Sequence, residues 1–309
     1  MASQAAPLLI TPSDLADKLK SPAGISILDA TWFMPNAPRN AREEFMNSRI
    51  HHSQFLDLDG VASPHELGLK HMMPNSQTFA KACVEKLGIS RDTRVVIYDS
   101  HGVFSSPRAL FMFRAFGHIN SSVLDGGLPR WVDEGYSATS GSLATPKFGQ
   151  YDAPQLDADT IRSYEQMVSN SQLEGDAYEI LLDARAKGRF TGIDAEPRPG
   201  LSSGHIPGSY SLPFNLFLRR QSNKKGDLEY TTFLSPSEIR EALNTAVGTT
   251  KAQDIVDGRK PVITSCGSGM TAAVLWLGLQ LLGVRKVGLY DESWTGYAMR
   301  SGSKIEKST

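Results

Sequence analysis

The chain has 309 residues, of which 40% are hydrophobic and 21% charged. At about 150 residues per domain this length predicts two domains with their own cores, and the composition excludes a disordered chain or a small disulfide-stapled module. Lys and Arg number 32 and Asp and Glu 33, so the chain lacks the positive field of nonspecific nucleic-acid binders, and we expect no direct nucleic-acid ligand.

The expected compartment is the cytoplasm. The chain has two cysteines, Cys83 and Cys266, which fits a reducing environment. Its first ten residues carry no basic region before an apolar run, as a secretory signal would. Apolar runs all fall short of the roughly 18 residues that a membrane span requires, so we expect no membrane association. A mitochondrial fraction of the protein is left open.

Short β-branched runs alternate with helical stretches along the whole chain. Strands that alternate with helices predict an α/β fold with mainly parallel sheets flanked by helices. The predicted strands are residues 25–28, 94–98 and 122–124 in the first half, and 179–182, 261–265 and 286–290 in the second.

The two sets of predicted strands repeat each other. The first run of each set ends in Leu-Asp-Ala, at Asp29 and at Asp183, and the second run ends at Asp99 in one half and at Cys266 in the other. Matched motifs at nearly constant separations indicate a duplicated domain. Only the second copy offers a thiol at this position.

A polar stretch separates the copies. Residues 137–160 are rich in Ser, Gly, Pro, Thr and Asp and have no apolar period, which is typical of an exposed linker. The predicted boundaries are an N-terminal domain at 1–140, a linker at 141–160 and a C-terminal domain at 161–309.

Cys266 opens a glycine-rich turn, Cys-Gly-Ser-Gly-Met-Thr, between a predicted strand at 260–265 and a predicted helix at 271–282. Glycines let the backbone curl with its N–H groups inward, and the following helix adds its positive end. Such a cradle stabilises the Cys266 thiolate and makes it nucleophilic. A buried structural cysteine is the alternative. A cysteine-dependent phosphatase is disfavoured because its phosphate-clamping Arg is replaced by Ala272.

Several motifs together resemble the tandem rhodanese-domain sulfurtransferases. Besides the Cys266 loop, they are Asp183-Ala-Arg185, Gly188-Arg-Phe190, Glu196-Pro-Arg198, Gly204-His-Ile-Pro-Gly208 and Tyr290-Asp-Glu-Ser-Trp294. The resemblance implies two rhodanese-like domains, a catalytic second domain without a cofactor, and a first domain that lacks the nucleophile. It also implies that Cys266 accepts sulfur as a persulfide.

Within this family the chain is similar to the members that use 3-mercaptopyruvate. Members that prefer thiosulfate typically carry basic residues after the nucleophile, whereas this loop has Gly267, Ser268 and Gly269. The resemblance therefore implies sulfur transfer from 3-mercaptopyruvate, release of pyruvate, and passage of the sulfur to a thiol such as thioredoxin. Three alternatives stay open: a thiosulfate sulfurtransferase, a persulfide carrier for a tRNA-thiolation protein, and a noncatalytic binding module.

The resemblance assigns roles to residues around the nucleophile. Arg189 and Arg198 are expected to grip the substrate carboxylate, because a guanidinium donates two parallel hydrogen bonds. Asp59, His71 and Ser268 are expected to form a relay that polarises the substrate carbonyl and handles the proton of the departing enolate. The remaining expected substrate-binding residues are Gly267, Gly269, Met270 and Thr271.

Other residues are expected to be structural. We expect Arg185 to pair with Asp183 or another acidic neighbour, and Cys83 to be a packed thiol in a helix over 79–87. No metal site is expected: His51 and His52 are adjacent in a segment predicted to be extended, where neighbouring side chains point in opposite directions. Glu292 is expected to add a negative charge near the Cys266 loop.

Overall fold

The computed structural model describes residues 5–21, 24–143, 145–146, 148–173, 175, 177–223 and 225–308. The chain forms two compact units: unit 1 is Met1–Ser63, Met73–Asp157 and Arg219–Phe233, and unit 2 is Pro64–Met72, Ala158–Leu218 and Leu234–Thr309. Each unit contains one short segment from the other half of the sequence. The compact units and the contiguous predicted domains are therefore different divisions of the chain.

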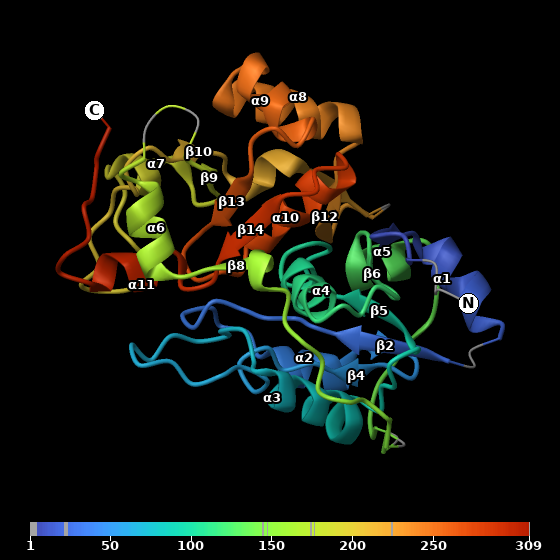
Figure 1. Cartoon of the computed structure of the whole chain (residues 1–309). Helices are drawn as coiled ribbons and strands as arrows, with labels where there is room; N and C mark the ends of the chain where they lie inside the picture. Colours follow the sequence, from blue (N-terminus) through green and yellow to red (C-terminus); the bar gives the residue numbers. More distant parts are fainter. Residues whose placement is uncertain are drawn as a thin grey trace. The chain divides into compact units, whose positions relative to one another are not determined.

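Unit 1 is built on a five-stranded parallel sheet (Figure 1). The strand order is β1(Leu9–Ile10), β6(Ser121–Leu124), β5(Arg94–Tyr98), β2(Ile25–Asp29) and β4(Gln54–Phe55). Its helices are α1(Pro12–Leu19), α2(Ala41–Asn47), α3(Ser76–Lys81), α4(Ser106–Ala115) and α5(Gly127–Asp133), with a π-helical turn η1(Ala82–Leu87) directly after α3.

Helices of unit 1 bury both faces of this sheet. Leu15 of α1 and Trp131 of α5 pack into one core cluster with Ile27, Val96 and other strand residues. α4 contacts β5 and β6. Burial of these side chains is the main favourable contribution to folding of the unit.

Unit 2 repeats this architecture. Its parallel sheet has the order β8(Ile161–Arg162), β14(Val287–Tyr290), β13(Val262–Ser265), β9(Ile180–Asp183) and β10(Tyr210–Ser211). Its helices are α6(Tyr164–Asn170), α7(Lys187–Thr191), α8(Pro236–Val247), α9(Thr249–Val256), α10(Ala272–Leu281) and α11(Ser293–Met299), with 3-10 turns η2(Ala158–Thr160) and η3(Phe214–Phe217). The strands occupy the same positions as in unit 1, which confirms the predicted α/β fold and its duplication.

Helices also cover both faces of the second sheet. Met167 of α6 and Trp294 of α11 pack in one cluster with Leu181, Ile263 and Tyr290. α10 contacts β13, β14, α8 and η3. The carboxyl ends of β9 and β13, where Asp183 and Cys266 lie, therefore meet at one edge of a sheet that is buried on both faces.

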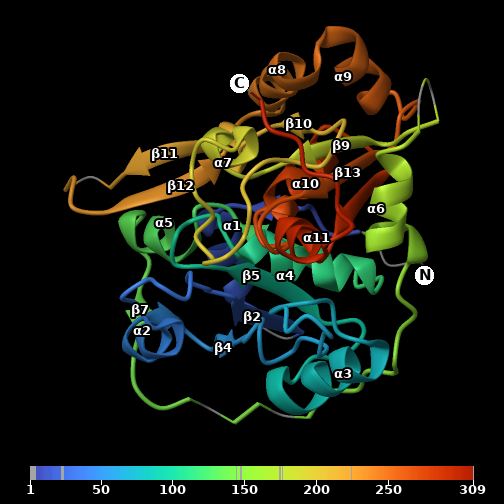
Figure 2. The ribbon, with the colours of Figure 1, turned by 90° about the vertical axis from the view of Figure 1, so that its left-hand side faces the viewer.

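Two small sheets complete the fold. β3(Arg49–Ile50) pairs with β7(Ala138–Thr139) in antiparallel fashion. β11(Leu218–Ser222) and β12(Glu229–Phe233) form a two-stranded sheet, labelled in Figure 2. β12 belongs to unit 1, where the backbone N–H of Thr231 donates to the carbonyl of His101 over 3.1 Å.

Two local expectations were wrong. The stretch 137–160 is not exposed throughout, because Tyr151 is only 7% exposed and its hydroxyl hydrogen-bonds Nδ1 of His118 over 2.9 Å. His51 and His52 lie in a turn, not an extended segment: His52 has φ +63°, and the two ring centroids are 3.8 Å apart. A left-handed residue reverses the chain and brings neighbouring side chains together.

The described residues hold no cluster of three or more His, Cys, Asp or Glu side chains arranged to bind a metal. Within the same residues, no helix has the length and apolarity to cross a bilayer. Cys83 is fully buried in η1, as predicted, and burial raises the pKa of its thiol to about 12.

Candidate active site

Cys266 lies at the turn from β13 into α10 and is 2% exposed. Gly269 in this turn has φ +81°, a left-handed conformation that glycine adopts without strain. Among the described residues, no protein group accepts a hydrogen bond from the backbone N–H groups of residues 267–271. These donors are therefore left for a ligand at the turn.

Hydrogen bonds from the first residues of α11 hold this turn in place. The backbone N–H groups of Trp294 and Thr295 donate to the carbonyls of Cys266 and Gly267 over 2.9 and 3.0 Å. The backbone N–H of Cys266 donates in turn to Oγ of Ser293 over 3.1 Å. Helix N-termini carry unpaired N–H groups, and here two of them bind the carbonyl groups of the Cys266 turn.

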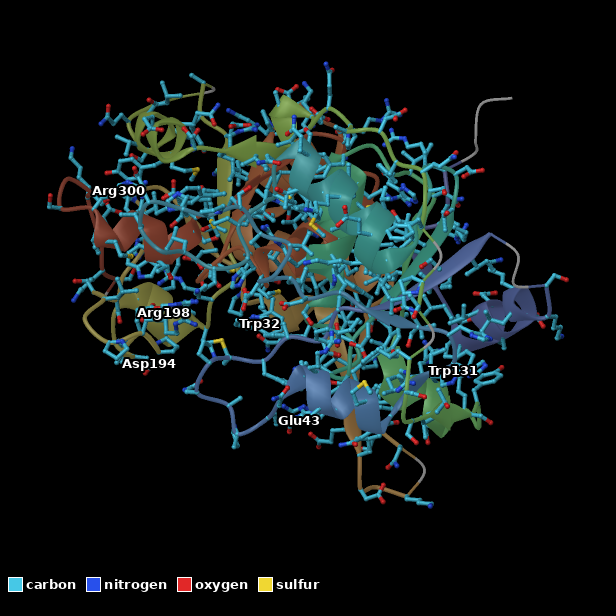
Figure 3. All side chains as sticks on the ribbon, turned by 90° about the horizontal axis from the view of Figure 1, so that it is seen from below. Trp32, Glu43, Trp131, Asp194, Arg198 and Arg300 are labelled. Atoms are coloured by element: carbon cyan, nitrogen blue, oxygen red, sulfur yellow. The ribbon has the colours of Figure 1, made fainter. Side chains whose placement is uncertain are left out.

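Arg189 and Arg198 converge on Gly267. A Cβ atom on Gly267 would lie 3.2 Å from Nη2 of Arg189 and 3.7 Å from Nη1 of Arg198. Arg189 is on α7, and Arg198 is in the following loop, where Figure 3 labels it near Asp194. Nη1 of Arg198 also donates to Oγ1 of Thr295 over 3.1 Å. Two cationic groups thus flank the residue next to Cys266.

A buried carboxylate orients Arg189. Glu196 has a side chain only 2% exposed and pairs with Arg189 at 2.5 Å and with Arg185 at 2.7 Å. Arg185 also pairs with Asp183 at 2.6 Å, as predicted. The contacts of Glu196 could not be predicted from the sequence, because a loop carboxylate seven positions after Arg189 has no periodic signal.

His71 meets Ser268. His71 lies in Pro64–Met72, which belongs to unit 2, and its Nε2 is 2.9 Å from Oγ of Ser268. The ring is buried, and the residue has φ +46°, a left-handed conformation that is strained for a residue other than glycine. Asp59 belongs to unit 1, where it accepts a hydrogen bond from Nε1 of Trp32 over 3.2 Å. Its place in the relay stays a prediction.

A cavity of about 200 Å³ opens beside Ser268 and Arg198. Its wall combines two cationic groups, two hydroxyls, one carboxylate and apolar groups, which gives a small polar cavity. The lining residues are Leu67, Gly68, Leu69, Lys70, Met72, Arg198, Ser268, Glu292, Thr295 and Met299. Gly269, Met270 and Thr271 are not among them: Met270 is buried and Thr271 immediately precedes α10. A substrate-binding role for these three stays a prediction.

The corresponding loop of unit 1 contains its own anion. Oδ2 of Asp99 accepts hydrogen bonds from the backbone N–H groups of Phe104, Ser105 and Ser106 over 2.9, 3.0 and 2.9 Å. Oδ1 accepts from the N–H of His101 over 2.9 Å. The turn after β5 therefore holds a carboxylate that unit 1 supplies itself.

Known proteins are similar to this chain in fold and in sequence. The family model of the rhodanese-like domain matches residues 11–134 and again 164–300. The chain is 39% identical to "Probable 3-mercaptopyruvate sulfurtransferase" of Schizosaccharomyces pombe, with 92% of this chain and 90% of that protein covered. It is 38% identical to human 3-mercaptopyruvate sulfurtransferase, with 95% and 92% covered.

Two further matches bear on the chemistry. Bovine thiosulfate sulfurtransferase is 38% identical, with 88% of this chain and 84% of that protein covered. The crystal structure of SseA from Escherichia coli, described as showing the rhodanese fold and catalytic mechanism of 3-mercaptopyruvate sulfotransferases, superposes with a TM-score of 0.76 at 30% identity and covers 94% of this chain and 99% of that one. Two rhodanese-like matches and relatives of this coverage place the chain in the rhodanese family, as a two-domain sulfurtransferase.

Proposed function

We propose that the enzyme takes sulfur from 3-mercaptopyruvate onto Cys266 and passes it to a thiol. The observation that carries the proposal is the convergence of Arg189 and Arg198 on Gly267, directly beside the thiol. Two guanidinium groups there suit the single carboxylate of 3-mercaptopyruvate, since each can donate paired hydrogen bonds to it. A carboxylate held at this place brings the substrate sulfur toward Cys266.

In the first step the Cys266 thiolate attacks the sulfur of 3-mercaptopyruvate. A sulfur–sulfur bond forms, the carbon–sulfur bond breaks, and its electron pair moves onto the carbon skeleton as the enolate of pyruvate. The proton lost from the substrate thiol is returned to the enolate at carbon, which gives pyruvate, and Cys266 keeps the sulfur as a persulfide anion. The backbone N–H groups of residues 267–271 point to stabilisation of the negative persulfide, as the corresponding donors do for Asp99 in unit 1.

Ser268 and His71 assist the departure of the enolate. Negative charge develops on the carbonyl oxygen as the carbon–sulfur bond breaks, and the Ser268 hydroxyl can donate a hydrogen bond to it. His71, 2.9 Å from that hydroxyl, can supply and accept the proton through Ser268. The pair thus serves as the acid–base part of the mechanism.

In the second step a thiolate acceptor, such as that of thioredoxin, attacks the outer sulfur of the persulfide. The acceptor gains that sulfur as its own persulfide, and the Cys266 thiolate leaves. A protein of tRNA thiolation in place of a general thiol would leave the first step unchanged. A pull-down combined with a thiolation assay distinguishes the two acceptors.

Mass spectrometry of the intact protein tests the proposal. Mixed with 3-mercaptopyruvate and no acceptor, the protein should gain the mass of one sulfur atom at Cys266 and release one pyruvate per chain. Cys266→Ser should do neither, because an alcohol is a poor nucleophile at neutral pH. Cys83→Ala is the matched control and should load normally. Pyruvate release by Cys266→Ser at the parent rate would end the proposal.

Thiosulfate is the second candidate donor, since the bovine relative is named for it. Lys70 and Arg198 in the cavity wall give some cationic character, but the turn itself offers Gly267, Ser268 and Gly269 without a cation. We expect kcat/KM to favour 3-mercaptopyruvate by a wide margin. Equal kcat/KM values for the two donors would refute this donor assignment and leave the persulfide chemistry standing.

A further inference from the structure

Glu292 lies directly before α11 and forms a partly buried ion pair with Arg300 at the other end of that helix. Its side chain is 14% exposed. One carboxylate oxygen contacts Nη1 of Arg300, and the other is 3.2 Å from Nη2. Arg300, labelled in Figure 3, also donates from Nη1 to the carbonyl of Gly296 over 2.7 Å. The geometry is that of a two-point guanidinium–carboxylate pair.

Gly296 makes this pair possible. Glu292, Gly296 and Arg300 follow each other at intervals of four and therefore lie on one face of the helix. A Cβ atom on Gly296 would collide with Oε2 and Cβ of Glu292 and would come within 3.1 Å of Cδ1 of Leu69. The missing side chain lets Glu292 cross the helix surface to Arg300 and lets Leu69 approach the same face.

The pair also reaches the segment that carries His71. Nε2 of His65 is 3.6 Å from Oε1 of Glu292, and Nη2 of Arg300 is 3.6 Å from Oε1 of Glu66. Nδ1 of His65 accepts a hydrogen bond from the backbone N–H of Leu67 over 3.2 Å. Because Nδ1 is an acceptor, the ring proton is on Nε2 and faces Glu292.

The far end of the same segment holds a strained residue. His71 is left-handed at φ +46° while its Nε2 is 2.9 Å from Oγ of Ser268. A non-glycine residue in this region costs roughly 1 to 3 kcal/mol and persists only where its surroundings hold it. Segment Pro64–Met72 has no helix or strand of its own, so its side-chain contacts contribute to that support.

We propose that Glu292 is a positioning residue for the proposed reaction. With Arg300 it fastens segment Pro64–Met72 to α11, the helix whose N-terminus also holds the carbonyls of Cys266 and Gly267. The same helix thereby fixes the positions of both His71 and Ser268. The inference rests on the proposed function, because it assumes that this contact assists the release of pyruvate.

A direct role of Glu292 in substrate binding is disfavoured by its contacts. Both carboxylate oxygens face cationic or N–H groups of Arg300 and His65, and a carboxylate facing the cavity would repel an anionic donor. The expectation that Glu292 adds negative charge near the loop is therefore modified: Arg300 balances that charge, and the pair acts on the segment instead.

Kinetics of Glu292→Gln test the proposal, because glutamine keeps the side-chain volume and removes the charge. We expect kcat for pyruvate release to fall about tenfold, while KM for 3-mercaptopyruvate changes less than about twofold, since Arg189 and Arg198 are untouched. Glu241→Gln is the matched control: Glu241 is an exposed carboxylate on α8, and both constants should stay at the parent value. An unchanged kcat in Glu292→Gln would overturn the proposal.

A double-mutant cycle separates positioning from general stability. In a His71→Ala background, Glu292→Gln should have almost no further effect on kcat, because the group that it positions is gone. A full tenfold loss on top of His71→Ala, or a His71→Ala variant as fast as the parent, would contradict the proposal. Persulfide loading of the parent at Cys266 is measured in parallel, and its absence would refute the proposed function itself.

Discussion

Gly267 follows Cys266 in the chain and lies beside both Arg189 and Arg198. Its missing side chain leaves the space that Nη2 of Arg189 and Nη1 of Arg198 approach, at 3.2 and 3.7 Å from the position of a Cβ. The residues that follow Cys266 in the turn, Gly267, Ser268 and Gly269, carry no charged side chain. The structure shows that the cations come from α7 and the loop after it, so an arginine at position 267 would compete for space with two others.

Gly267→Ala should impair use of the donor without unfolding the protein. The added methyl group stands beside the two guanidinium groups that we propose as the site of the substrate carboxylate. We therefore expect KM for 3-mercaptopyruvate to rise roughly tenfold. The melting temperature should stay within a few degrees. Gly302→Ala is the control, because a Cβ there meets nothing within 4 Å. An unchanged KM in Gly267→Ala would show that the carboxylate binds elsewhere.

Arg198→Ala should lower kcat/KM for 3-mercaptopyruvate roughly ten- to a hundredfold, the range expected for loss of a charged hydrogen-bonded contact of about 1.5 to 3 kcal/mol. Arg198 donates to Thr295 and holds no buried carboxylate, so unfolding by urea should be little changed. Arg240→Ala on α8, whose guanidinium contacts Asn244 and Gln253, should keep the parent kcat/KM. Equal kcat/KM in Arg198→Ala and the parent would contradict the assignment.

At the scale of elements, the conformation of the loop after β5 depends on the side chain of Asp99. Asp99 accepts four backbone hydrogen bonds, from His101, Phe104, Ser105 and Ser106. Each buried donor left without an acceptor costs about 1 to 3 kcal/mol. These bonds shape the entry into α4, whose first residue is Ser106.

Asp99→Ala should therefore destabilise the protein strongly, by more than about 3 kcal/mol in urea unfolding. Asp99→Asn keeps one carbonyl oxygen as an acceptor and should lose less. Asp92→Ala, an exposed carboxylate in the same unit, provides the comparison and should unfold at nearly the parent urea concentration. A stable Asp99→Ala variant would mean that water or a rearranged loop satisfies these N–H groups.

The central strands of the two five-stranded sheets could be predicted from the sequence, because β-branched runs such as 94–98 and 261–265 have a strong local signal and lie in the middle of a buried sheet. These strands are β2, β5, β6, β9, β13 and β14. β4 and β10 have only two residues each and carry no such signal. The pairing of His71 with Ser268 came from family resemblance, since no periodic pattern links residues so distant in sequence. The Glu292–Arg300 pair was missed because it depends on the space above Gly296.

At the scale of the whole molecule, buried titratable groups make stability depend on pH. Burial is the main cause that lowers the pKa of His118 from 6.5 to about 4. Its Nε2 donates to the carbonyl of Thr93 over 2.8 Å, and Nδ1 accepts from the hydroxyl of Tyr151. The environment of His118 in the folded protein therefore favours the neutral imidazole ring.

Acid should weaken the fold between pH 6.5 and 4. Above pH 6.5 the ring is neutral in both states and its stabilising effect is complete; as the pH falls toward 4, the unfolded chain gains the proton first and folding is disfavoured, by on the order of 3 kcal/mol. Urea unfolding across this range measures the loss. A His118→Gln variant should show a flatter pH dependence, and an equally steep one would assign the loss to other groups.

The two loops of the repeat differ in where their negative charge comes from, and this difference has a dynamic consequence. The unit 1 loop is closed on the permanent carboxylate of Asp99, so its amide hydrogens should exchange slowly whether or not the enzyme is turning over. The amides of residues 267–271 have no protein acceptor within the described part of the chain. Their exchange with deuterium should slow when sulfur is loaded onto Cys266 and recover when an acceptor removes it. The exchange rate of this loop would then report whether Cys266 carries sulfur.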